Sequence, residues 1–344
     1  MKKIIILFCA IFCAVVLYAQ ESPLEEQLIK ASYDGNLQTV QTLLSNPNVD
    51  INATYRGLTA LANACLKGNL DIVKELLSHK NININKGETD RNKRTPLMLA
   101  SIIGHADVVA ELLKHSPKLN KRDKKGYTAL MYAAYYGHMD VAQELLAQKN
   151  IKVNVFTNWN YDKWGNDIYG PTALLIAYNR GHRDIAMEIL KVKPRREVKE
   201  IFAEMYQYYD AFNSQGNTLL LLAARDGDIE MVKYLFKIEN DRPLLKKVNS
   251  PLVRANCMNN DGDTSLVLAA RNGYLDIVLE ILKQDSFTFD AMNSQGRRAY
   301  REAATQEIRD AIDNYKGPSQ KTSETIKGKV LKSVEYFKKK INKK

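Results

Sequence analysis

The hydrophobic positions of this chain fall into two alternating helical patterns that recur along most of its length. The blocks TALANACLKG, TPLMLASIIG, TALMYAAYYG, TALLIAYNRG, TLLLLAARDG and TSLVLAARNG begin at Thr59, Thr95, Thr128, Thr172, Thr218 and Thr264. In each block an apolar stripe follows the threonine, and a glycine comes nine residues after it. A second segment follows each glycine, with apolar residues at the spacing of one helix face, as at Ile72, Val73, Leu76 and Leu77. The pattern predicts six consecutive pairs of short helices.

Each block contains its own start and stop signals. Threonine is a good N-cap for a short helix, because its hydroxyl accepts a hydrogen bond from an orphan amide of the first turn. Glycine ends the helix, because it adopts the left-handed backbone conformation without strain. Alanines such as Ala100 let neighbouring helices approach closely. Polar stretches such as VDINA and NININ then lead into the next block.

These blocks resemble the ankyrin repeat, most closely in TPLMLASIIGHADVVAELL. The resemblance covers about Leu24 to Lys316 (residues 24–316), including a degenerate first repeat, LIKASYDGNLQTVQTLL, and a closing half-repeat, SQGRRAYREAATQEIRDAI. It implies an all-α ankyrin-repeat solenoid, in which helix-turn-helix repeats are joined by β-hairpin fingers. The family usually has histidine where Met98 stands, and no block keeps it. The hydrogen bonds of that histidine between neighbouring turns are therefore expected to be missing and replaced by apolar packing.

The two ends of the chain differ from the repeats in composition. MKKIIILFCAIFCAVVLYAQ combines two lysines, a short apolar run and a small residue, which predicts a secretory signal peptide over residues 1–19. The apolar run is shorter than a membrane span requires, and an uncleaved anchor is the alternative. We therefore expect an exported protein that is periplasmic or secreted. Export permits disulfides, but Cys65 and Cys257 lie several repeats apart and no bridge between them is expected.

The formal net charge of +11 lies mostly at the C-terminal end, because nine lysines face only Glu324 and Glu335 in residues 321–344. This tail, residues 317–344, predicts a basic amphipathic helix with one apolar stripe, made of Ile326, Val330, Val334, Phe337 and Ile341. Such a helix can be solvated and dock on the last repeat, lie on an anionic membrane surface, or bind another partner. Nucleic acid is not expected, because aromatic residues are not interleaved with the lysines.

One enlarged connection holds both tryptophans of the chain. NVFTNWNYDKWGNDIYGPT, residues 154–172, joins two blocks whose threonines are farther apart than the family period of about 33 residues allows. Its aromatic residues favour strands and its Asn, Asp and Gly residues favour a turn, which predicts a projecting hairpin. Two interpretations stay open: the tryptophans form a small core for the hairpin, or they bind a partner.

The candidate partner-binding residues are those of the hairpin together with the pair that precedes the glycine in successive blocks. They are Ile102, Ile103, Tyr127, Tyr135, Tyr136, Trp159, Tyr161, Trp164, Tyr169, Asn179 and Arg180. Tryptophan and tyrosine are enriched among interface hot spots. The resemblance implies that a protein partner binds to a concave face formed by the fingers and the first helices. The alternatives are a membrane-surface protein that acts through its tail, and a host-directed secreted effector.

No motif for chemistry stands out in the sequence. No glycine-rich loop precedes a Lys-Ser/Thr pair, and no Ser or Cys shares a nucleophile motif with a His and an acid. His105, His138 and His182 follow repeat glycines, where the family commonly has histidine, and are expected to be structural. We therefore expect a non-enzymatic, monomeric binding protein without cofactor or metal.

Overall fold

The computed structural model describes residues 23–87, 92–158, 171–192, 215–240, 258–284 and 294–315. Regular secondary structure within these ranges is helical, and none of the helices there is both long and apolar enough to cross a membrane. The expected signal peptide and tail, and the tryptophan hairpin from residue 159 to residue 170, lie outside the described residues. The chain forms two compact units, residues 1–160 with 180–192 and residues 161–179 with 193–344.

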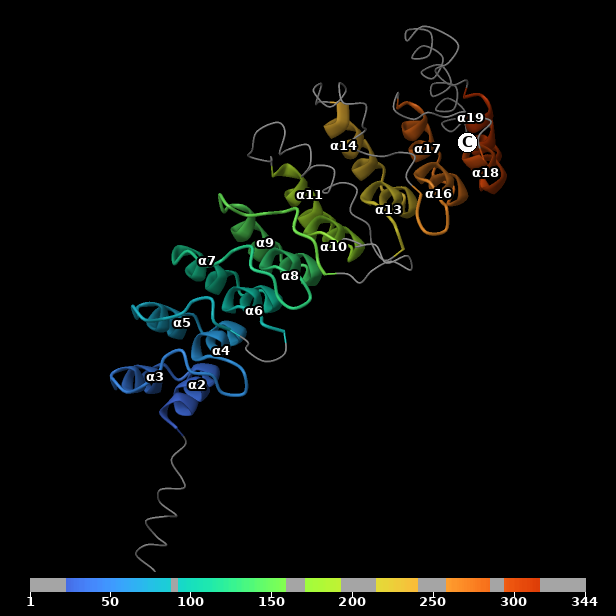
Figure 1. The fold of residues 1–344 in the computed structure, drawn as a ribbon. Helices are drawn as coiled ribbons and strands as arrows, with labels where there is room; N and C mark the ends of the chain where they lie inside the picture. Colours follow the sequence, from blue (N-terminus) through green and yellow to red (C-terminus); the bar gives the residue numbers. More distant parts are fainter. Residues whose placement is uncertain are drawn as a thin grey trace, which may run out of the picture. The chain divides into compact units, whose positions relative to one another are not determined.

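The first unit is a stack of helices in two layers (Figure 1). The first helices of successive repeats pack side by side in chain order, and the second helices pack on them and on one another. The first helices are α2 (Leu24–Asp34), α4 (Ala60–Lys67), α6 (Pro96–Ile103) and α8 (Ala129–Tyr136). The second helices are α3 (Leu37–Leu44), α5 (Leu70–Leu77), α7 (Ala106–Lys114), α9 (Met139–Leu146) and α11 (Arg183–Lys191). The predicted pairing of short helices is confirmed in this unit.

The second unit repeats the two-layer arrangement. One layer contains α10 (Ala173–Asn179), α13 (Leu219–Asp226), α16 (Ser265–Arg271) and α18 (Ser294–Glu302). The other contains α14 (Ile229–Asn240), α17 (Leu275–Leu282) and α19 (Gln306–Asp313). The helices α18 and α19 belong to the half-repeat that was expected to close the array.

The helix starts are capped as predicted. The hydroxyl of Thr95 accepts a hydrogen bond from the backbone N–H of Met98 at 3.2 Å, and Thr128 does the same for Met131 at 3.3 Å. In return, the sulfur of each methionine accepts from the backbone N–H of its threonine at 3.4 Å. Both methionines are buried. Methionine therefore adds a weak acceptor to the cap at the position where the family usually has histidine.

The glycines that end the first helices have a second role besides their left-handed backbone. Gly104 has φ +93°, and a β-carbon added to it would lie 2.5 Å from Nδ1 of His138 in the next repeat. His105 covers Gly68 and His182 covers Gly137 in the same way. The structural role expected for the three histidines is confirmed, because each ring packs against the glycine turn of the preceding repeat.

Asparagines join the repeats of the first unit across their connections. The side chain of Asn52 donates to the carbonyl of Asn81 at 2.8 Å and accepts from the N–H of Asn83 at 2.7 Å. Further along the same unit, the side chain of Asn120 donates to the carbonyl of Asn150 and accepts from the N–H of Lys152, both at 2.8 Å. The methionines at the histidine position are buried, as the expected apolar packing requires, and these side-chain amides add hydrogen bonds to backbone groups of the following repeat.

The described connections are turns rather than the β-hairpins that were expected. An isolated bridge pairs Tyr55 with Leu58 across a tight turn. In the connection before α8, the carboxylate of Asp123 accepts backbone hydrogen bonds from Lys125 and Tyr127, both at 2.8 Å. A side chain therefore supplies the acceptor that a second strand would offer, and the chain reverses without a ladder.

Ion pairs hold the closing half-repeat on the last full repeat. The buried carboxylate of Asp263 accepts from Arg271 and Arg298, both at 2.7 Å. The same two guanidinium groups contact Glu302 from α18, at 2.5 and 2.8 Å. The hydrogen bonds from Arg298 and Arg271 lower the pKa of Glu302. Two charges of each sign therefore alternate at this contact, which satisfies the buried Asp263.

Cys65 has a buried position on α4. It is free in the structure, and burial raises the pKa of its thiol. Cys257 lies outside the described residues, so the expected absence of a bridge between the two stays a prediction. The thiol is inert in this environment, because the reactive thiolate is disfavoured away from water.

Candidate functional site

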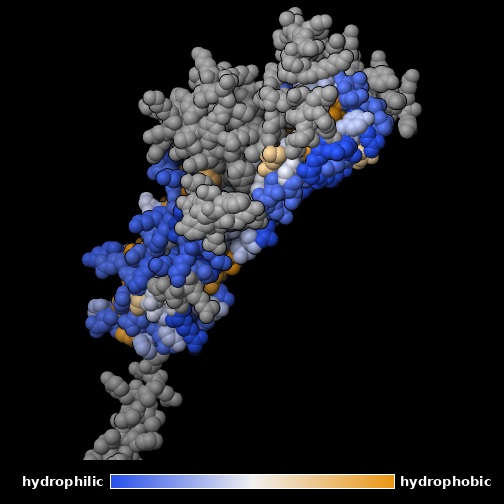
Figure 2. All heavy atoms as spheres, turned by 45° about the vertical axis from the view of Figure 1, so that its right-hand side comes forward, coloured by the Kyte–Doolittle hydropathy of each residue, from blue (hydrophilic) through white to orange (hydrophobic). Residues whose placement is uncertain are grey.

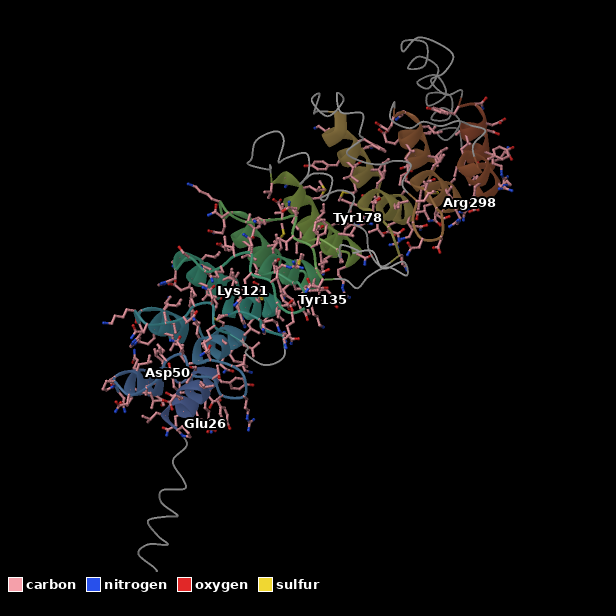
Figure 3. The ribbon with its side chains drawn as sticks, viewed as in Figure 1. Glu26, Asp50, Lys121, Tyr135, Tyr178 and Arg298 are labelled. Atoms are coloured by element: carbon pink, nitrogen blue, oxygen red, sulfur yellow. The ribbon has the colours of Figure 1, made fainter. Side chains whose placement is uncertain are left out.

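Four tyrosines of one repeat in the first unit form a continuous row of ring contacts, and we call them the tyrosine cluster. Tyr127 comes from the connection before α8, and Tyr132, Tyr135 and Tyr136 come from α8 itself. The ring centroid of Tyr127 lies 5.2 Å from that of Tyr132 and 6.4 Å from that of Tyr135. Tyr135 and Tyr136 meet edge to face at 4.9 Å. Figure 3 labels Tyr135 within this part of α8. The cluster therefore joins the connection to the end of the helix in one aromatic surface.

Asp123 fixes the connection end of the cluster. Its carboxylate is buried, and besides the two backbone bonds it accepts one from the Tyr132 hydroxyl at 2.5 Å. Gly126 completes the turn with φ +81°. Burial and the Asp123 hydrogen bond raise the pKa of Tyr132, and burial raises the pKa of Tyr127. Both phenols therefore stay protonated at neutral pH and present O–H groups.

His138, which precedes α9 in the same repeat, supports the other end of the cluster. The rings of Tyr136 and His138 lie nearly parallel, with centroids 6.2 Å apart. Nε2 of His138 donates to the carbonyl of Ile102 at 2.9 Å, because a carbonyl oxygen can only accept. This hydrogen bond brings the end of α6, with Ile102 and Ile103, beside the end of α8.

Exposure is concentrated on two side chains of this surface. Tyr136 is 49% exposed and Ile103 is 45% exposed, which places both among the few large hydrophobic residues that the described chain exposes. Tyr127, Tyr135 and Ile102 are half-buried. Figure 2 shows a mostly hydrophilic surface on the face it presents, with hydrophobic residues in small separate areas. Within the described residues of the first unit, Tyr136 and Ile103 are the two most exposed large hydrophobic side chains.

Arg180 adds a positive charge to the cluster. Its guanidinium carbon lies 3.7 Å from the ring centroid of Tyr135, which is a close cation–π contact. Arg180 is nevertheless exposed and belongs to the first unit. Asn179, its neighbour in sequence, ends α10 and is also exposed, but it belongs to the second unit.

The structure brings together six of the predicted site residues. They are Ile102, Ile103, Tyr127, Tyr135, Tyr136 and Arg180. Trp159, Tyr161, Trp164 and Tyr169 lie outside the described residues, so their role stays a prediction. Sequence reasoning missed Tyr132 and Asp123. For Asp123 a signal was available, because an aspartate three residues before a glycine is typical of a turn that the aspartate side chain closes.

Positive charge is concentrated on one connection of the first unit. The connection before α8 carries exposed cations at Lys118, Lys121, Arg122, Lys124 and Lys125. Figure 3 labels Lys121 on this connection. The second helices carry both signs. In α5, α7, α9 and α11 an acid in the first turn is followed by another four residues later, and two of these acids, Glu111 and Glu188, are ion-paired with Lys114 and Lys191. The tyrosine cluster therefore lies beside the positive part of this unit.

Within the described residues, no group of three or more His, Cys, Asp or Glu side chains is arranged to hold a metal ion. The exposed and half-buried groups of the surface are phenols, aliphatic side chains and cations, with one buried carboxylate whose oxygens accept three hydrogen bonds. This arrangement is suited to contact another surface.

Two family models match the chain. The model described as ankyrin repeats (3 copies) matches residues 28–123 and 83–157, and the model described as ankyrin repeat matches residues 215–243. No curated protein matches the chain. The first model covers part of α2 and all of α3 to α9, including the tyrosine cluster.

Proposed function

Because the chain is an ankyrin-repeat protein, we propose that it binds a protein partner through the surface of its first unit centred on the tyrosine cluster. Ankyrin repeats are in general protein–protein interaction modules, and proteins built from them are typically non-enzymatic scaffolds. The proposed mechanism is recognition by a preformed surface that includes the first helices and the connections before them.

The observation that carries this proposal is the packed but partly exposed row of tyrosines. Neighbouring rings, His138 and Arg180 hold the half-buried rings in place, so little side-chain entropy is lost when a partner contacts them. Tyr136 at the end of α8 and Ile103 at the end of α6 are both exposed, and the hydrogen bond from His138 to Ile102 joins these two helix ends. Tyrosine and arginine are the residue types that most often dominate binding energy at interfaces.

The place of action that we propose is outside the cytoplasm, in the periplasm or after release from the cell. This rests on the charged start and short apolar run of residues 1–19. A second candidate function is supported by the tail, because its apolar stripe and lysines fit an anionic membrane surface. In that case the tail would locate the protein and the tyrosine cluster would bind the partner.

Crosslinked capture from the native extracytoplasmic fraction tests the binding surface. We would compare the wild type with Ile103→Ala/Tyr136→Ala, which removes the two most exposed anchors, and with Tyr300→Ala, which removes an exposed tyrosine from the second unit. Hot-spot truncation costs about 2 kcal/mol or more, so capture by the double variant should fall ~30-fold. Circular dichroism would establish that each variant keeps its helices.

The Tyr300→Ala variant should capture the same partner as the wild type. Equal capture by all three chains would place the binding surface elsewhere and contradict the proposal. Capture by none of them would argue against a protein partner in that fraction.

A further inference from the structure

We propose that the segment recognised at the tyrosine cluster is an acidic peptide segment, with carboxylates that pair with the surrounding cations and an apolar side chain that packs beside Tyr136 and Ile103. This inference rests on the proposed function, because it names the chemistry of the partner at the same surface.

Two cations of the connection before α8, Lys121 and Arg122, donate to neutral oxygens. Arg122 donates to the carbonyl of Gly126 at 3.4 Å and to the side-chain oxygen of Asn158, and Lys121 donates to the carbonyl of Asn85 at 3.3 Å. Neutral acceptors satisfy N–H groups but leave the positive charge in place. The one acid of this connection, Asp123, is buried and already accepts three hydrogen bonds.

The positive charge continues onto the cluster. Arg180 sits over the Tyr135 ring, and an arginine in a cation–π contact keeps its edge N–H groups for a carboxylate, often in a two-bond fork. Arg94, which precedes α6, acts electrostatically on Tyr132 from the neighbouring repeat. Cations from three successive repeats therefore converge on the same aromatic surface.

The second helices offer an acidic segment less than the connection before α8 does. In α7 and α11 the lysines Lys114 and Lys191 are already paired with Glu111 and Glu188, and α9 carries two acids and no cation, so an acidic segment is steered to the connection. The electrostatic attraction would set the orientation and the association rate, while the rings would supply apolar contact area. A membrane fits this surface less well, because its most exposed apolar groups, Tyr136 and Ile103, are too few to form a broad inserted face.

Selection from a random peptide display library on the immobilised full-length protein tests the inference. The wild type should enrich peptides that contain Asp or Glu residues together with an apolar residue. The triple variant Lys118→Glu/Lys121→Glu/Lys125→Glu reverses the charge of exposed positions on the connection before α8 and should lose these peptides. The best acidic peptide, measured by calorimetry at low salt, should bind the triple variant at least about tenfold more weakly.

The matched control has the same change in net charge on the other layer. Lys74→Glu/Lys114→Glu/Lys191→Glu alters exposed lysines of α5, α7 and α11 and should keep the enrichment of acidic peptides. This control separates a local effect from an effect of total charge.

Three results would overturn the inference. If the wild type enriches neutral or basic peptides, the partner is not acidic, although the proposed binding function would stand. If nothing is enriched above background on the wild type, the surface does not recognise acidic peptides, and the capture experiment then decides the proposed function by itself. If vesicles with 30% phosphatidylglycerol bind the wild type and the control but not the triple variant, the cations recognise lipid rather than peptide.

Discussion

Replacing Asp123 by alanine should destabilise the first unit and loosen the tyrosine cluster at the same time. The Asp123 carboxylate accepts from the backbone N–H groups of Lys125 and Tyr127 and from the hydroxyl of Tyr132. All three bonds are lost in Asp123→Ala. With a net contribution of about 1 kcal/mol for each, the free energy of unfolding should fall by about 3 kcal/mol. Asp123→Asn should cost less, because its amide oxygen can still accept the two backbone bonds.

Urea unfolding followed by circular dichroism would measure the change in the free energy of unfolding. Because repeats unfold partly independently of one another, amide hydrogen exchange at Lys125 and Tyr127 should be measured as a local probe, and both amides should exchange faster. Asp140→Ala is the matched control, since Asp140 is exposed in the first turn of α9 and should cost under about 1 kcal/mol. If Asp123→Ala costs no more than Asp140→Ala, the carboxylate does not organise this turn and the reasoning is refuted.

Two further results follow from contacts between repeats. Gly104→Ala should lower the free energy of unfolding in urea by about 2–3 kcal/mol. Of this, ~1–2 kcal/mol comes from the left-handed alanine and ~1 kcal/mol from the displaced His138 bond. Adding His138→Ala removes the ring that the β-carbon meets and should restore part of the stability, and no recovery would show that the two do not meet. The lowered pKa of Glu302 means that its ion pairs contribute fully above its unfolded pKa of about 4.3 and are lost as the pH falls through the lowered folded value. The thermal midpoints of wild type and Glu302→Gln should therefore differ at pH 6 and converge in acid, and a constant difference would contradict this assignment.

The helix pairs could be predicted because their signals are local. Thr95 lies three residues from the amide that it caps, and Gly104 follows its own helix directly, so the spacing along the chain contains the information. The surface residues at the ends of α6 and α8 could be placed for the same reason. Trp159 and Trp164, which were expected beside them, lie outside the described residues and stay a prediction.

The contacts between repeats could not be predicted in the same way. Asn120 bonds to residues about one repeat further along the chain, and His138 lies against a glycine of the preceding repeat. Such pairs depend on the register in which two repeats stack, which no spacing within one repeat defines. The bond between Tyr132 and Asp123 was missed because a tyrosine on a first helix looks like an ordinary packing residue until the turn is folded against it.

The rings that cover the glycine turns make the order of synthesis matter. Gly68, Gly104 and Gly137 are each covered by a histidine that is synthesised later, in the following repeat. When a nascent chain has emerged only as far as α7, the Gly104 turn lacks its ring and the carbonyl of Ile102 lacks the His138 donor. Each newly added repeat therefore completes the one before it, and a chain that stops between two repeats leaves an open end that the next ring would have closed.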